Sequence, residues 1–287
     1  MFVLNNGQEM PKLALGTYLL HGEELFNSVE AALKTGYRSF DTAKYYENEK
    51  ELGDALKELL PRYNLTTEDI FITTKIFPFA SDNQDEEIKK ELETSMEYLG
   101  RSYLDLVLVH YPRPLDCGDK DARNKIYRKH AWLALEKLHA DGKIRSIGVS
   151  NYEQNHIEEM SEYMKIEPQV NQVEYHPHFQ RGPLRTFCQE KEILFQSFSP
   201  LGRGNKTLLN DTTMAKIATK HQTSVAVIIL TWIIMGNNGV VAKSANPDRI
   251  EQNFKSTILD LTDDEFSEIK DLDLGTPYVE DCGWLVQ

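Results

Sequence analysis

The sequence predicts an α/β protein with the (β/α)8 (TIM) barrel fold, and three observations indicate this class. Short β-type runs recur along the 287 residues, helical patterns separate them, and no G-x-G-x-x-G motif follows the first run. Strands that alternate with helices form parallel sheets with right-handed crossovers. Such a chain folds as a doubly wound open sheet or as a closed barrel, and a total of eight runs favours the barrel.

The predicted strands are preceded by a turn signal, Asn6-Gly7, between apolar residues. This dipeptide is typical of a β-hairpin, which we expect to cap one end of the barrel. The strands themselves are expected at 13–16 (LALG), 37–40 (YRSF), 70–74 (IFITT), 104–109 (LDLVLV), 143–149 (KIRSIGV), 168–173 (PQVNQV), 193–198 (ILFQSF) and 239–242 (GVVA).

Helical patterns fill the gaps between these runs. In residues 23–36, Leu25, Val29 and Leu33 share one face, and Gly36 is placed to end the helix. Two further helix starts are marked by Asn246 as N-cap ahead of Pro247, and by a capping box of Thr262 with Glu265.

Composition and charge exclude several classes of function. With 40% hydrophobic residues and 11 prolines, the chain has enough apolar side chains for a sizeable core, and we expect one domain over residues 1–287. The formal charge of −13 opposes binding to nucleic acid or to anionic lipid. The longest apolar run, 224–235, is too short to span a bilayer and predicts a buried helix.

The cysteines and histidines do not form a disulfide or metal-binding pattern. Cys117, Cys188 and Cys282 are widely spaced and odd in number. The segment 176–178 (His-Pro-His) is the nearest candidate for a ligand pair, but its proline favours a turn. No basic segment precedes an apolar run at the N-terminus, so we expect no signal peptide, and we predict a cytoplasmic location.

Polar side chains follow three successive predicted strands. Asp41 follows 37–40, Lys75 follows 70–74 and His110 follows 104–109. Each alone has an ordinary explanation, as a structural ion pair or a hydrogen-bonded core histidine. Because the carboxyl ends of barrel strands meet at one rim, where active sites lie, the three together predict a catalytic site. Further polar residues at this rim are Ser150, Asn151, Gln172, Glu174, Ser199, Lys243 and Ser244.

Tyr46, five residues beyond Asp41, is a candidate proton donor for this site. A phenol titrates near pH ~10, and a neighbouring ammonium lowers its pKa. We therefore expect Lys75 to activate Tyr46, Asp41 to keep Lys75 charged, and His110 to donate to a substrate oxygen. Such a set can protonate an oxyanion. No metal is expected, because Lys75 would repel a cation.

Eight segments spread over nearly the full chain carry a family resemblance: MPKLALGTY, GYRSFDTAKYYENEKELG, ITTK, LDLVLVHYP, GVSNY, NQVEYHP, FSPLGRG and VAKSANPDRIEQN. Through these segments the sequence closely resembles the aldo-keto reductases. The resemblance implies a (β/α)8 barrel whose bottom is closed by the N-terminal hairpin. It also implies a catalytic tetrad of Asp41, Tyr46, Lys75 and His110, in which Tyr46 is the general acid.

The resemblance further implies that a nicotinamide cofactor binds extended across the rim, without a Rossmann fold. Because Lys243 and Arg249 can pair with a ribose 2′-phosphate, NADPH is expected in preference to NADH. The residues implied are Ser150, Asn151 and Gln172 at the carboxamide, Phe198 on the ring, Thr17 and Tyr18 beside the nicotinamide, Ser199 and Leu201 at the pyrophosphate, and Lys243, Ser244, Arg249, Gln252 and Asn253 at the adenosine end.

The sequence departs from the family pattern at several of these positions. Phe198 replaces a frequent tyrosine, Ala242 a frequent proline, and Gln252 a frequent glutamate. Tryptophans that often line family pockets are replaced here, which predicts a roomier or more polar pocket. The implied substrate-binding residues are Tyr18, Tyr45, Phe77, His110, Tyr111 and Trp284.

The leading hypothesis is an NADPH-dependent reductase of aldehydes, and of ketones as a second substrate class. We expect it to be a monomer whose partner is a small carbonyl compound. One alternative is a cofactor-binding barrel with a regulatory or structural role and no physiological turnover. Another is an aldolase-like barrel with Lys75 as Schiff-base nucleophile, which Asp41 would oppose by keeping the amine charged.

Overall fold

The chain forms a closed barrel of eight parallel strands, which confirms the predicted fold class. The computed structural model describes residues 1–279 and 283–287. Around the barrel the strands follow the order β10, β3, β4, β5, β6, β7, β8, β9. Their bounds are β3 Leu13–Gly16, β4 Ser39–Asp41, β5 Phe71–Ile76, β6 Leu104–Val109, β7 Ile144–Ser150, β8 Val170–Glu174, β9 Leu194–Phe198 and β10 Gly239–Ala242.

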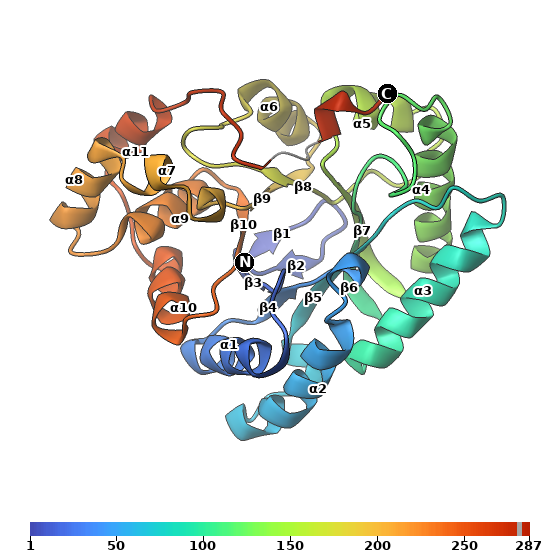
Figure 1. Cartoon of the computed structure of the whole chain (residues 1–287), viewed down its shortest axis with the longest axis horizontal. Helices are drawn as coiled ribbons and strands as arrows, with labels where there is room; N and C mark the ends of the chain where they lie inside the picture. Colours follow the sequence, from blue (N-terminus) through green and yellow to red (C-terminus); the bar gives the residue numbers. More distant parts are fainter. Residues whose placement is uncertain (280–282) are drawn as a thin grey trace.

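Helices surround the strands, as seen along the barrel in Figure 1. The α-helices are α1 Gly22–Thr35, α2 Glu49–Leu59, α3 Gln84–Leu99, α4 Asn124–Ala140, α5 Gln154–Met160, α6 Gly182–Glu190, α7 Lys206–Leu209, α8 Thr212–Lys220, α9 Val225–Met235, α10 Pro247–Phe254 and α11 Asp263–Lys270. Short 3-10 turns are η1 Lys44–Tyr46, η2 Leu60–Tyr63, η3 Thr67–Asp69, η4 Gly202–Gly204, η5 Lys255–Thr257 and η6 Gly283–Leu285.

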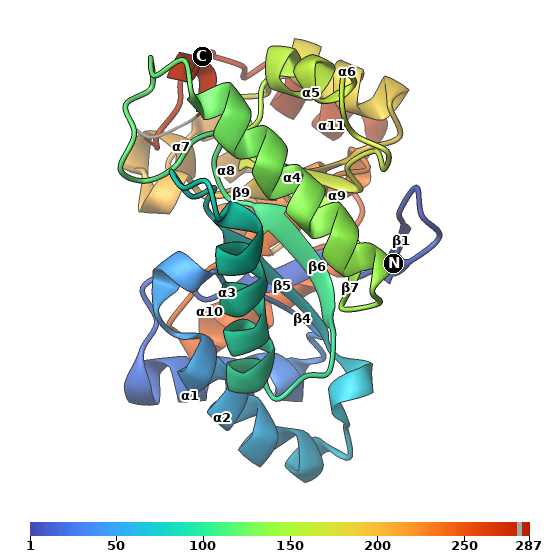
Figure 2. The ribbon, with the colours of Figure 1, turned by 90° about the vertical axis from the view of Figure 1, so that its right-hand side faces the viewer.

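The N-terminal hairpin closes the amino end of the barrel. Strands β1 (Phe2–Val3) and β2 (Glu9–Met10) pair antiparallel around the predicted turn. The Asn5 amide donates to the carbonyl of Pro168 just before β8, and the Asn6 amide donates to the carbonyl of Arg145 in β7. Figure 2 shows the hairpin standing out from one end of the barrel. The carboxyl end is therefore the end left open for a ligand.

The local signals for helix ends operate as predicted. Gly36 ends α1 in the left-handed conformation at φ 117°. Asn246 accepts a hydrogen bond from the Arg249 backbone at the start of α10, and Thr262 forms the capping box with Glu265 ahead of α11. Buried residues make up most of α9, as its apolar composition indicates.

Strand ends differ from the prediction where the ladder extends further than the apolar run. Asp41 is the last residue of β4, and Lys75 lies within β5, because Asp41 pairs with Thr73 and Lys75 pairs with Leu108. Conversely, β8 begins only at Val170, after Pro168, which has no N–H to donate.

Within the described residues, no single helix is long and apolar enough to cross a membrane. The pair α8 and α9 reaches that length only when taken together, and the two are bent by 92° at their junction. The same residues contain no cluster of three or more ligands that could hold a metal ion. Cys117 and Cys188 are free thiols, and Cys282 lies outside the described residues.

Candidate active site

Asp41 and Lys75 form a buried ion pair at the open end of the barrel. The Lys75 Nζ atom lies 2.5 Å from Asp41 Oδ1 and also donates to the carbonyl of Thr42 at 2.9 Å. Both side chains are almost fully buried. Burial by itself lowers the pKa of Lys75, but Asp41 and Tyr46 outweigh it, and the net pKa lies above the ordinary value. Lys75 is therefore charged at neutral pH.

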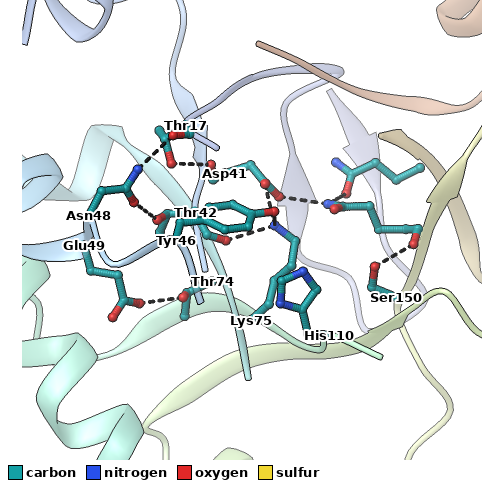
Figure 3. A network of polar contacts seen from close by, with 12 residues as sticks. Thr17, Asp41, Thr42, Tyr46, Asn48, Glu49, Thr74, Lys75, His110 and Ser150 are labelled. Atoms are coloured by element: carbon teal, nitrogen blue, oxygen red, sulfur yellow. Dashed lines mark hydrogen bonds and ion pairs between the residues drawn. The ribbon is translucent and has the colours of Figure 1, made fainter. Parts of the chain in front are cut away.

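Tyr46 meets Lys75 from the turn η1, which follows β4. Its phenolic oxygen lies 3.3 Å from Lys75 Nζ (Figure 3). Its ring centre lies 5.0 Å from that of Tyr18. The Tyr46 N–H closes η1 by donating to the carbonyl of Ala43. Residues from β4, β5 and η1 thus converge as the strand order predicts.

The pKa of Tyr46 moves in the direction opposite to that predicted from the sequence. Burial is the largest influence and raises the pKa of the phenol; Lys75 lowers it, and Asp41 raises it again. The ammonium therefore limits the rise but does not reverse it. As a result, Tyr46 holds its proton at neutral pH.

His110 lies beside this group, among aromatic rings. Ring centres of Phe77, Tyr46 and Tyr45 lie 4.7, 5.7 and 6.2 Å from its imidazole. Burial, followed by the charge of Lys75, holds the pKa of His110 well below the usual value. His110 is therefore uncharged at neutral pH and serves as a hydrogen-bond donor or acceptor. Its Nδ1 atom is buried and has no hydrogen-bond partner within residues 1–279 and 283–287.

Two glutamines support the ion pair from the opposite wall of the barrel. The Gln172 amide donates to Asp41 Oδ2 and to Gln196 Oε1, both at 2.8 Å. The sequence reading assigned Gln172 to a ligand and missed Gln196. The sequence did offer a signal for Gln196, since it is a polar residue within the apolar run of β9. A buried side-chain amide at such a position needs a hydrogen-bond partner.

A ladder of polar groups leads from Gln172 to His110. Ser150 donates to the Gln172 carbonyl at 2.8 Å, and the Asn151 amide donates to the His110 carbonyl at 3.0 Å. Asn151 adopts φ 61°, a conformation uncommon for residues other than glycine. Its Oδ1 atom is buried and finds no partner among the described residues. This leaves a hydrogen-bond acceptor beside His110.

The residues predicted to hold a cofactor follow β3, β9 and β10. Thr17 is fully buried, and its hydroxyl donates to the Asp41 carbonyl at 3.0 Å, which joins the end of β3 to the end of β4. At the end of β9, Phe198, Ser199 and Leu201 are partly exposed, and Ser199 has φ 47°.

The segment after β10 presents two cations at the start of α10. Lys243 and Arg249 are exposed, and neither forms an ion pair within the described part of the chain. The Asn246 side chain caps the helix, whose N-terminus favours anions. Ser244 and Asn253 are nearly buried on this segment, and Gln252 is exposed.

A cleft of about 700 Å³ opens beside the aromatic group. Tyr45, Phe77 and Leu115 are among the residues that line it, and the ring centres of Tyr45 and Phe77 lie 5.6 Å apart. Tyr111 is largely buried, and the Arg113 guanidinium lies 5.2 Å from its ring centre. Of the residues predicted to contact a substrate, Tyr18, Tyr45 and Phe77 therefore adjoin Tyr46 or His110 directly.

The segment 283–287 packs against the same rim. A side chain at Gly283 would place its Cβ 1.7 Å from the Asn151 carbonyl oxygen, so only glycine fits. The His156 ring bonds to the Val286 carbonyl at 2.9 Å. Trp284 is 38% exposed, with its ring centre 5.8 Å from that of Phe179. Trp284 is thus near the rim, and its packing partner is the loop after β8.

A closed barrel with ionisable side chains gathered at the carboxyl ends of its strands is the usual form of a TIM-barrel enzyme. A model of the Aldo/keto reductase family matches residues 12–274. The chain belongs to this family, and it is an oxidoreductase that acts on carbonyl groups. Members of the family generally use a nicotinamide cofactor.

The chain is similar to curated proteins along almost its whole length. It is 38% identical over 272 residues to the 9,11-endoperoxide prostaglandin H2 reductase of Trypanosoma cruzi (strain CL Brener), covering 94% of this chain and 90% of that protein. It is 38% identical over 270 residues to the glyoxal reductase of Bacillus subtilis (strain 168), covering 93% and 90%.

A solved structure is similar in fold. The crystal structure of an aldo-keto reductase enzyme from a Medee basin deep-sea metagenome library has a TM-score of 0.86 and 35% identity, and the match covers 98% of this chain and 97% of that one.

Proposed function

We propose that the protein is an NADPH-dependent reductase of aldehydes, and of ketones as a second substrate class, with Tyr46 as general acid. The observation that carries the proposal is the 3.3 Å contact between the Tyr46 hydroxyl and the charged Lys75, beside an uncharged His110. The proposed unit is one barrel domain over 1–287, acting as a cytoplasmic monomer.

The protein's part in the reaction is to place and protonate the carbonyl oxygen. The nicotinamide, when bound, supplies the hydride. His110 cannot serve as the acid, because its low pKa leaves it uncharged, so it orients the oxygen through its N–H. Tyr46 keeps its proton until the alkoxide forms. That alkoxide is a far stronger base than phenolate. Water, taken here in place of an alcohol, has a pKa of about 15.7, whereas phenol has a pKa of about 10.

Lys75 and Asp41 act through Tyr46. The charged Lys75 stabilises the phenolate left after proton transfer, when its attraction for Tyr46 is strongest. Asp41 keeps the ammonium in place through the 2.5 Å hydrogen bond. A Schiff base at Lys75 is disfavoured, because a lysine whose pKa is raised is not a nucleophile at neutral pH.

The cofactor assignment is supported by unmatched groups on the described residues. The buried Asn151 Oδ1 can accept from the nicotinamide carboxamide. Lys243 and Arg249 offer two cations without carboxylate partners in the described chain, at a capped helix N-terminus, which suits a 2′-phosphate. Phe198 offers an aromatic face for the ring.

The test follows NADPH absorbance with purified protein and a panel of aldehydes, including glyoxal, then repeats it with Tyr46→Phe. We expect kcat to fall roughly 10²–10⁴-fold while NADPH binding is retained. Tyr103→Phe is the matched control, since it removes a hydroxyl bonded to Glu68 at the far end of the barrel.

Other outcomes contradict particular parts of the proposal. Retained turnover in Tyr46→Phe would remove Tyr46 from the role of acid. NADPH binding without turnover of any carbonyl would favour a regulatory barrel, and borohydride trapping of a substrate on Lys75 would favour Schiff-base chemistry.

A further inference from the structure

Asn48 links three parts of the candidate site through one fully buried side chain. Its Oδ1 accepts from the Thr42 hydroxyl at 2.8 Å, and its Nδ2 donates to the carbonyls of Thr17 and Leu20 at 2.8 and 3.0 Å. Figure 3 shows Asn48 between Thr17 and Thr42, on the side of Tyr46 away from His110. One acceptor and two donors are what an amide offers, so aspartate cannot make the same bonds.

The position of Asn48 in the chain makes this use of its side chain unexpected. It is the N-cap residue of α2, where asparagine ordinarily accepts a hydrogen bond from the first helical turn. Here the side chain makes no capping bond. The amide is directed back into the barrel instead, and the local helix start goes without that stabilisation.

Each bond of Asn48 reaches a segment that carries part of the site. The backbone carbonyl of Thr42 accepts a hydrogen bond from Lys75 Nζ at 2.9 Å. Thr17 and Leu20 bound the turn that carries Tyr18, and the Leu20 N–H donates to the Thr17 carbonyl within it. Asn48 itself is two residues beyond Tyr46. The amide thus joins the turn of the proposed proton donor to the turn of Tyr18.

The backbone around Tyr46 needs such a tie. Glu47, between Tyr46 and Asn48, has φ 56°, a left-handed conformation that a side chain disfavours. Strained residues of this kind persist where surrounding contacts fix them. The amide of Asn48 ties the η1–α2 junction to Thr17 after β3 and to Leu20 in the loop that follows. One turn further along α2, Glu51 also accepts from the Gly22 N–H at 2.6 Å, so the loop after β3 is held to α2 at two places.

We propose that Asn48 is a positioning residue that sets where the Tyr46 hydroxyl stands relative to Lys75 and to the turn of Tyr18. The inference rests on the proposed reductase function. Its consequence is kinetic: without the amide, Tyr46 still carries its proton, but the hydroxyl is displaced from the reacting oxygen. Misplacement by about 1 Å can lower the rate of chemistry by roughly 10²-fold.

The test compares Asn48→Ala with Asn238→Ala. Asn238 is a matched control, because its buried amide also donates to two main-chain carbonyls, those of Ile233 and Gly236, at the closed end of the barrel. For Asn48→Ala we expect kcat to fall roughly 10–10²-fold with NADPH affinity changed less than about twofold. The deuterium isotope effect from C4-labelled NADPH should rise, because chemistry becomes slower than product release.

Asn238→Ala should lose thermal stability but keep the wild-type kcat per folded molecule and the wild-type isotope effect. Three results would overturn the inference: an unchanged isotope effect in Asn48→Ala, a loss of kcat equal to the loss of folded protein, or the same kinetic change in Asn238→Ala. Should Asn48→Ala not fold, Thr42→Val removes one of the three bonds with little change in shape and is expected to act in the same direction.

A readout without turnover separates this inference from the proposed function. In protein labelled with ¹³Cζ-tyrosine, the Tyr46 signal is assigned by its loss in Tyr46→Phe. It should shift or broaden in Asn48→Ala and remain in place in Asn238→Ala. If the wild type reduces no carbonyl, the reductase proposal fails, while this signal still decides whether Asn48 positions Tyr46; an unmoved signal contradicts it.

Discussion

The Nζ atom of Lys75 lies 2.5 Å from Oδ1 of Asp41, and both side chains are almost fully buried at the mouth of the barrel. A charge pair in this setting costs solvation, and each partner depends on the other. The pair therefore serves two purposes that can be separated by experiment: it maintains the fold of the rim, and it keeps an ammonium beside Tyr46.

Replacing Asp41 with asparagine should damage both purposes. Breaking a buried ion pair from one side leaves the other charge uncompensated and costs about 3–5 kcal/mol of stability. The pKa of Lys75 should also fall, because Asp41 is the main group that raises it against burial. We expect Asp41→Asn to unfold at lower urea concentration and to lose most of its carbonyl reduction.

The matched control is Asp105→Asn. Asp105 is equally buried and pairs with Arg101 at 2.8 Å, away from the open rim. It should lose comparable stability and retain turnover per folded molecule. Equal loss of turnover in both variants would mean that activity follows stability alone, with no separate role for the charge on Lys75.

The pH dependence of reduction should be flat through the neutral range. Tyr46 must carry its proton, and burial places its pKa above 10, so the alkaline fall should begin only above that value. His110 must be uncharged, and its pKa lies well below 6.5. Protonation of His110 should therefore lower the rate only at pH values well below 6.5. The measurement is kcat/KM for an uncharged aldehyde from pH 6 to 10.5, in buffers of constant ionic strength.

A break in this profile near pH 7 would contradict the assignment. It would require a group with an ordinary histidine pKa to titrate during the reaction, which the buried, Lys75-facing His110 does not offer.

Cofactor choice should depend on the cations that follow β10. Lys243→Ala removes a charge that suits a 2′-phosphate, and a lost charge-assisted hydrogen bond at an exposed site is expected to weaken NADPH binding about tenfold, or about 1.4 kcal/mol. NADH binding should hardly change. Lys255→Ala, at an exposed position beyond the end of α10, is the control. Equal weakening of NADPH and NADH would place Lys243 elsewhere on the cofactor.

The fold was predictable because its signals are local and repeated. Eight apolar runs, the Asn6-Gly7 turn and the caps at Gly36 and Asn246 each concern a few neighbouring residues, and each is present in the structure. Strand order followed from the handedness of βα units. The strand ends were less accurate, since Asp41 and Lys75 join the ladder through partners on other strands.

The candidate site was predictable in its membership but not in its electrostatics. Asp41, Tyr46, Lys75 and His110 do converge. The sequence predicted a lowered pKa for Tyr46, whereas the structure raises it. Burial depends on the assembled rim and cannot be read from neighbouring residues, and its effect on the pKa outweighs that of the adjacent ammonium. Asn48 and Gln196 were missed for a related reason: their partners lie on other strands and turns, at no fixed spacing in the sequence.

The C-terminal segment should respond to acid through His156. This buried ring accepts from the Glu153 N–H at Nδ1 and bonds to the Val286 carbonyl at Nε2, and burial lowers its pKa from 6.5 to about 4. Between these values the unfolded chain binds the proton and the folded one does not, so stability present above pH 6.5 is lost as pH falls. The loss should reach about 3 kcal/mol near pH 4.

His156→Gln, which does not titrate, should be less stable at pH 7 but should lose about 3 kcal/mol less on acidification. Urea denaturation of both proteins from pH 7 to 4 measures the difference, in which the other titrating groups cancel; parallel curves would mean that the folded state protonates His156 as easily as the unfolded chain.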